Sequence, residues 1–167
     1  NEVAAGIAAE YFNETSIGTK ALAMVTAGPG LTNIVTAVAG AYLESRELLV
    51  IGGQVKTADL ARGVLRQRGI QEIDGVSIVQ PITVKSVLVD EPISFDAFKS
   101  IVLHDGVYRP GPVFIEIPID IQARVVEFTT PKTNNLVAEL PKISLGDIAG
   151  VVNKINHAKR PAILLGG

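Results

Sequence analysis

The feature that most constrains the fold is a short apolar run followed by a glycine-rich corner and a small-residue segment. It reads ALAMVTAGPGLTNIVTAVAGAYLE over residues 21–44. Ala21–Thr26 has the length of a buried strand, and Leu31–Leu43 carries apolar side chains at helical spacing. Gly28-Pro29-Gly30 separates the two. The pattern predicts a strand, a tight corner and a helix that is buried nearly all round.

The same alternation of strand and helix continues along the chain. Further strands are predicted at 48–53, 82–89 and 111–118, and further helices at 2–13 and 94–108. The last of these helices has Ser94 as its predicted N-cap and Phe95, Phe98, Ile101 and Val102 facing inward. The chain is 47% hydrophobic but only 5% aromatic, a composition typical of parallel sheets buried on both faces. We therefore predict an α/β fold, a mainly parallel sheet with helices on both faces.

Periodicity fades between residues 121 and 143, where Thr, Pro, Asn and Lys accumulate. It returns after Ser144 and Asp147, which have capping-box spacing, and RPAILLGG then predicts the opening strand of a second sheet. We expect a near-complete α/β domain at 1–120, a linker at 121–143, and the beginning of another α/β domain at 144–167. Both ends lie inside such patterns, so we expect the sequence to be a segment of a longer protein.

Composition excludes several classes of function. The net charge is −2 with scattered basic residues, which argues against nucleic acid or a membrane surface as partner. There is no cysteine, hence no disulfide framework or thiolate metal site. No apolar run approaches the roughly 20 residues of a membrane span, and no signal-peptide pattern is present, so the cytoplasm is the expected location. No metal-ligand spacing and no Ser/His/Asp set is visible.

The corner at 28–30 does not match the common phosphate-binding fingerprints. Asn33 stands where the third glycine of G-x-G-x-x-G would be, and no Gly-Lys-Ser/Thr follows. Glycines at the end of a strand let backbone approach a ligand, but a plain strand-to-helix corner explains them equally well.

Other candidates also have an ordinary structural explanation. Glu2 begins a helix of small residues, either as a charge that complements the helix dipole or as a partly buried acid tuned by desolvation. Gln54 lies at the carboxyl end of a strand, where open α/β sheets bind ligands, or it satisfies a local turn. Residues 66–76 form a polar loop, and His104 and His157 are predicted at the surface.

Taken in order, six segments resemble one family: NEVAAGIAAEYF, VTAGPGLTN, IGGQV, IQEID, RPGPVFIEIPIDIQ and KRPAILLGG. The chain resembles the acetolactate synthase-like family of thiamine-diphosphate-dependent enzymes over essentially its whole length. The resemblance implies the thiamine-diphosphate-binding fold. Residues 1–120 would be the pyrimidine-binding domain without its first strands, and 144–167 would begin the central domain.

The resemblance assigns the cofactor contacts. Glu2 matches the glutamate that hydrogen-bonds a ring nitrogen of the aminopyrimidine, favouring the tautomer that can remove the C2 proton of the thiazolium; it is the implied catalytic residue. Gly28, Pro29, Gly30 and Asn33 match the loop that lies against the same ring. Gln71, and with it Gln54, matches the side of the site that faces the substrate. Arg109 to Pro112, Pro118 and Asp120 match structural positions of the domain's closing strand and turn.

The family also implies partners that this chain does not supply. Its Mg²⁺ and diphosphate are held by another domain, contributed by the partner subunit, so we expect no metal ligand here. The active site would lie at the interface of a homodimer or homotetramer, and the segment alone would be inactive. FAD is a further candidate cofactor, because some members bind it.

The function implied is decarboxylation of a 2-oxo acid and transfer of the resulting carbanion to an acceptor. Several positions depart from the family pattern: Asn1, Val3, Ile7, Ile70 and Val84, with Lys85 one place late. These changes leave Glu2 in place but fall near the substrate, so another 2-oxo acid or a sugar-like acceptor stays open. Nucleotide binding by the corner at 28–30 and the role of a non-catalytic regulatory relative stay open as well.

Overall fold

The computed structural model describes residues 1–103, 109–126 and 143–164. The chain divides into two compact units, Asn1–Thr133 and Asn134–Gly167. The first contains the sheet, and the second contains the helix α6 (Leu145–His157). Within the described ranges, no helix is both long and apolar enough to cross a membrane.

The first unit is built on a four-stranded sheet. Its strands are β1 (Leu22–Val25), β2 (Leu48–Gln54), β3 (Lys85–Leu88) and β4 (Pro112–Pro118), in the order β1-β2-β4-β3. Every neighbouring pair is parallel. The helices are α1 (Glu2–Thr15), α2 (Pro29–Glu44), α3 (Gly75–Val79), α4 (Phe95–Val102) and α5 (Ile119–Gln122), with 3₁₀ turns η1 (Thr57–Asp59) and η2 (Gln80–Ile82). The predicted parallel α/β architecture is confirmed.

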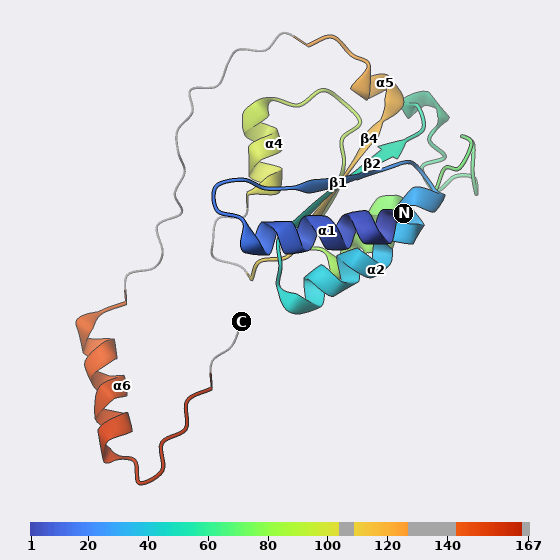
Figure 1. Cartoon of the computed structure of the whole chain (residues 1–167). Helices are drawn as coiled ribbons and strands as arrows, with labels where there is room; N and C mark the ends of the chain where they lie inside the picture. Colours follow the sequence, from blue (N-terminus) through green and yellow to red (C-terminus); the bar gives the residue numbers. More distant parts are fainter. Residues whose placement is uncertain (104–108, 127–142, 165–167) are drawn as a thin grey trace. The chain divides into compact units, whose positions relative to one another are not determined.

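The central strand β4 shows how the core is divided. Phe114 packs into the larger cluster, which includes residues of α1, α2, β1 and β2, whereas its neighbour Ile115 packs into a second cluster beside α4. Successive residues of a strand face opposite sides of the sheet, so the two clusters lie on opposite faces. Figure 1 shows α1 and α2 side by side, with α4 apart from them. Helices therefore cover both faces, as predicted.

Two predictions about burial are wrong. The helix α2 is not buried nearly all round, because only the stripe that contains Leu31, Ile34 and Val38 meets the sheet, and Leu43 is 72% exposed. Phe95 is 46% exposed, whereas Phe98, Ile101 and Val102 pack inward as expected. Phe95 is the first residue of α4, and side chains lean toward the helix N-terminus, so it extends past the packed surface.

Several boundaries differ from the prediction. The helix expected at 94–108 begins after the Ser94 cap but ends at Val102, while 104–108, including His104, lie outside the described residues. The loop expected at 66–76 runs into the short helix α3, capped by Asp74. Most of the linker expected at 121–143 also lies outside the described residues.

In the second unit, Ser144 caps α6 by accepting a hydrogen bond from the Asp147 amide at 3.1 Å, as the capping spacing predicted. His157 is exposed, also as predicted. The strand expected in RPAILLGG is not formed over residues 161–164, because strand geometry needs a hydrogen-bonded neighbour and none is present among the described residues.

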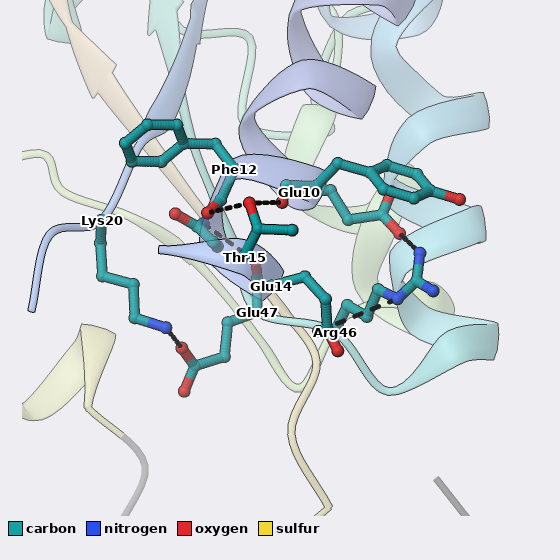
Figure 2. A network of polar contacts seen from close by, with 9 residues as sticks. Glu10, Phe12, Glu14, Thr15, Lys20, Arg46 and Glu47 are labelled. Atoms are coloured by element: carbon teal, nitrogen blue, oxygen red, sulfur yellow. Dashed lines mark hydrogen bonds and ion pairs between the residues drawn. The ribbon is translucent and has the colours of Figure 1, made fainter. Parts of the chain in front are cut away.

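A polar network joins the end of α1 to the turn between α2 and β2 (Figure 2). Nη1 of Arg46 donates to Oε1 of Glu10 at 3.1 Å, and its guanidinium lies 4.6 Å from the centre of the Tyr11 ring. The amide of Asn13 donates to the carbonyl oxygens of Ala21 and Glu47, both at 3.1 Å. The network fixes α1 relative to the sheet, and thereby fixes the opposite end of the helix, where Glu2 lies.

Candidate functional site

Glu2 is the first residue of α1, directly after its N-cap. The side chain of Asn1 accepts a hydrogen bond from the Ala4 amide at 3.2 Å, which begins the helix at Glu2. The Glu2 side chain is half-buried. Its pKa is lowered, first by its own backbone N–H and next by the side chain of Asn33. The desolvation that the sequence suggested is outweighed, and Glu2 is held as a carboxylate.

Asn33 lies one turn into α2 and points at Glu2. Its Nδ2 donates a hydrogen bond to Oε2 of Glu2, which connects the first turns of α1 and α2. The two helices pack side by side in Figure 1. Two of the site residues predicted from sequence are therefore brought into direct contact.

The corner between β1 and α2 is a strand-to-helix turn, as predicted. Gly28 is the N-cap of α2 with φ +64°, and Pro29 occupies the first helical turn, where a missing N–H costs nothing. A Cβ at Gly28 would lie 2.4 Å from the carbonyl oxygen of Gln71. The corner therefore needs glycine for its φ and for its close contact with the loop that carries Gln71.

Gln71 and Gln54 line a common cavity of about 530 Å³, together with residues of β1, β2 and β4. Gln71 is exposed and has φ +61°, an uncommon conformation for a residue other than glycine. Gln54 is buried; its Nε2 donates to the Ile73 carbonyl at 2.9 Å, and its Oε1 accepts from the Val55 amide at 2.8 Å. The structure thus gives Gln54 a bracing role beside the cavity.

The closing strand and turn hold neighbouring segments. Asp120 accepts hydrogen bonds from the backbone N–H and the hydroxyl of Thr57, at 2.9 and 2.6 Å, and these bonds lower its pKa. Arg109 donates to the Leu43 carbonyl at 2.8 Å and to the Ser45 hydroxyl, fixing the end of α2. These contacts are of the structural kind that the resemblance implied.

Sequence reasoning missed Glu116, a carboxyl group buried in β4. Glu116 is 3% exposed, and burial raises the pKa of its carboxyl group to about 7. The one signal in the sequence was a single acidic residue inside PVFIEIP, a run of otherwise apolar residues that reads as a fully buried strand. Within the described ranges, no group of three His, Cys, Asp or Glu side chains could hold a metal ion.

Comparisons with known proteins agree on one family. Residues 1–78 match the family described as thiamine pyrophosphate enzyme, N-terminal TPP binding domain. The whole chain is 37% identical to the acetolactate synthase isozyme 1 large subunit of Escherichia coli K12, covering 29% of that protein. It is 32% identical to the acetolactate synthase large subunit of Corynebacterium glutamicum, covering 26% of that protein.

A eukaryotic relative shows the same relationship. The acetolactate synthase catalytic subunit, mitochondrial, of Aspergillus candidus is 32% identical over 99% of this chain and 25% of its own length. The chain therefore spans between a quarter and a third of the curated relatives it matches. On the family match and on similarity along its whole length, the chain belongs to the acetolactate synthase-like family of thiamine-diphosphate-dependent enzymes.

Proposed function

We propose that the protein containing this chain decarboxylates a 2-oxo acid and transfers the resulting carbanion to an acceptor, as acetolactate synthases do. The relatives' names support this reaction type. The observation that carries the proposal is the carboxylate of Glu2 held by the amide of Asn33, at the helix start that the family uses for its cofactor.

The described residues fit the aminopyrimidine end of thiamine diphosphate. A carboxylate with a lowered pKa is the group needed to hydrogen-bond a protonated ring nitrogen, and Asn33 fixes one of its oxygens. The corner at 28–30 is shaped by its glycines, because the Cβ positions at Gly28 and Gly30 are taken by Gln71 and Thr26, and the resemblance assigns this corner to the ring. Bound thiamine diphosphate supplies an electron sink for the carbanion left when CO₂ departs.

Each residue of the candidate site then has a separate task. Glu2 holds a proton against the ring nitrogen, and Asn33 orients the Glu2 carboxylate. Gly28 and Gly30 position the ring, and Pro29 makes the corner rigid. Gln71, beside the cavity that it shares with Gln54, faces the substrate.

The remaining parts of the proposal concern the longer protein. Mg²⁺ and the diphosphate would be bound by a domain outside this chain, and the complete site would form between two copies in a homodimer or homotetramer. The domain limits 1–120, 121–143 and 144–167 belong to this proposal. FAD binding and a cytoplasmic location also belong to this proposal.

The experiment measures CO₂ release from pyruvate and a panel of 2-oxo acids by the full-length protein with thiamine diphosphate and Mg²⁺. Glu2→Gln should lower kcat by at least about 100-fold, in the range of a lost acid–base group. Glu14→Gln, an exposed change on the same helix, is the matched control. Cofactor binding without turnover would identify a regulatory relative instead, and failure to bind the cofactor would overturn the proposal.

A further inference from the structure

The buried carboxyl group of Glu116 is not one of the residues assigned to the cofactor or the substrate. Glu116 is paired in register with Gly52 of β2 and Leu88 of β3, near the carboxyl end of the sheet. Its side chain is on the same face as Phe114, toward α2 and α3. A charged residue type is seldom this deeply buried without a specific partner or function.

Three elements meet near this side chain. A Cβ built on Gly75 would lie 2.5 Å from Oε1 of Glu116 and 2.7 Å from Cδ1 of Leu31. Glu116 in β4 therefore contacts the beginning of α3 at Gly75, and Leu31 in the first turn of α2 lies beside the same glycine. Among the described residues, Oε1 of Glu116 has no hydrogen-bond partner.

The residues from Gln71 to Gly75, here called the Gln71–Gly75 segment, connect this point to the candidate site. Gln54 holds the middle of the segment through the Ile73 carbonyl at 2.9 Å. The Gln71 carbonyl at its start contacts the corner at Gly28. Glu116 contacts the segment at its other end, at Gly75.

The charges around Glu116 favour its neutral form. Burial raises its pKa to about 7, an interaction with Gln54 offsets part of the effect, and Asp74 raises it further. Glu116 lines a cavity of about 450 Å³, and three further charged residues line it too: Glu72, Arg62 and Arg66. Arg62 is engaged with Asp90 at 2.9 Å, and Glu72 accepts hydrogen bonds from three backbone N–H groups.

We propose that Glu116 is a positioning residue whose side chain, packed against Gly75, fixes the Gln71–Gly75 segment against the corner at Gly28. The proposal rests on the proposed function in one respect, that Gln71 faces the substrate. An uncharged carboxyl group fits this buried position, where Oε1 of Glu116 has no hydrogen-bond partner among the described residues. The ionised group brings a second negative charge beside Asp74 and loosens the segment.

Hydrogen–deuterium exchange on the full-length protein without cofactor tests this placement. In the wild type, exchange of residues 71–76, corrected for the intrinsic pH effect, should rise by about tenfold between pH 6 and pH 8, which corresponds to a change of about 1.4 kcal/mol in the free energy of opening. Glu116→Gln, which cannot ionise, should stay protected at both pH values. Glu116→Ala should exchange rapidly at both. Glu91→Gln, an exposed change, should behave as the wild type.

Steady-state kinetics give the second readout. Above pH 7, KM for the 2-oxo acid should rise in the wild type and stay level in Glu116→Gln, with kcat less affected. The same pH response in wild type and Glu116→Gln, or Glu116→Gln as open as Glu116→Ala at pH 6, overturns the proposal. A protein without turnover would overturn the proposed function alone, since the exchange experiment still decides the role of Glu116.

Discussion

Nδ2 of Asn33 donates a hydrogen bond to Oε2 of Glu2, so the first turn of α2 fixes the carboxylate at the first turn of α1. This contact makes two helix starts, 31 residues apart in sequence, into one polar site. Glu2 is half-buried and Asn33 is exposed, so without this bond each side chain would retain more of its rotamer freedom.

Removal of the Asn33 amide should therefore weaken cofactor binding. We expect Asn33→Ala to raise the dissociation constant for thiamine diphosphate by about tenfold, the value of one hydrogen bond to a charged group. Isothermal titration calorimetry with the full-length protein and Mg²⁺ measures this dissociation constant. Thr36→Ala, one turn along the exposed side of α2, is the control. An unchanged constant in Asn33→Ala would show that Glu2 needs no orientation by its neighbour.

The same substitution should change the pH dependence of binding. The pKa of Glu2 lies below its ordinary value, so the carboxylate persists into acidic solution and protonates only as the pH falls through that lowered pKa. Without Asn33 the pKa rises part of the way back, because the backbone N–H, the larger cause, remains. The acid limb of cofactor binding should therefore move to higher pH in Asn33→Ala. Titrations from pH 7 down to about pH 3 would reveal the displacement, and identical limbs would contradict it.

Gly28→Ala should disturb both the corner and the loop of Gln71. A Cβ at this position would lie 2.4 Å from the Gln71 carbonyl oxygen, and the residue has φ +64°. We therefore expect Gly28→Ala to lower the free energy of unfolding by about 1–3 kcal/mol. Gly18→Ala separates the two causes, because Gly18 has φ +77° but nothing within 4 Å of its Cβ position. Chemical denaturation of both variants gives the comparison. Equal losses would mean that backbone strain alone, without the contact to Gln71, accounts for the effect.

The elements that could be predicted from sequence are those whose signal is local. β1, β2, β4 and the capped starts of α4 and α6 follow from apolar runs and from Ser94 and Ser144, which act within one turn. The burial of Phe95 and Leu43 was predicted wrongly, because it depends on which part of each helix reaches the sheet. For Asn33 the resemblance predicts a place beside the cofactor, but its bond to Glu2 depends on the packing of α1 on α2. Glu116 was missed because an acidic residue in a strand shows its burial only when the flanking helices are placed.

Arg46 should matter for stability more than the other ion pairs of the network. Glu10 is 4% exposed, and loss of Arg46 leaves its carboxylate buried without its partner. We expect Arg46→Met to lower the melting temperature of the full-length protein by about 2–5 °C. Lys20→Ala breaks the ion pair between Lys20 and Glu47, two exposed side chains whose charged atoms lie 2.6 Å apart, and should change the melting temperature little. Addition of Glu10→Gln should recover part of the loss in Arg46→Met, and no recovery would show that stacking on Tyr11 dominates.

The raised pKa of Glu116 leads to a prediction about how stability depends on pH. In the unfolded chain this carboxyl group releases its proton near its ordinary pKa of 4.5, whereas in the folded chain it does so only near 7. The folded state therefore binds more protons between these values, and the stability associated with Glu116 falls as the pH rises from about 4.5 to about 7 and stays low above it. Glu116→Gln removes this loss, so the variant should gain on the wild type by about 3 kcal/mol at pH 8 and by about 1 kcal/mol at pH 5.5. Urea denaturation of both proteins at the two pH values measures the gain, with Glu91→Gln as the exposed control. A gain that is the same at both pH values would mean that Glu116 has an ordinary pKa in the folded protein.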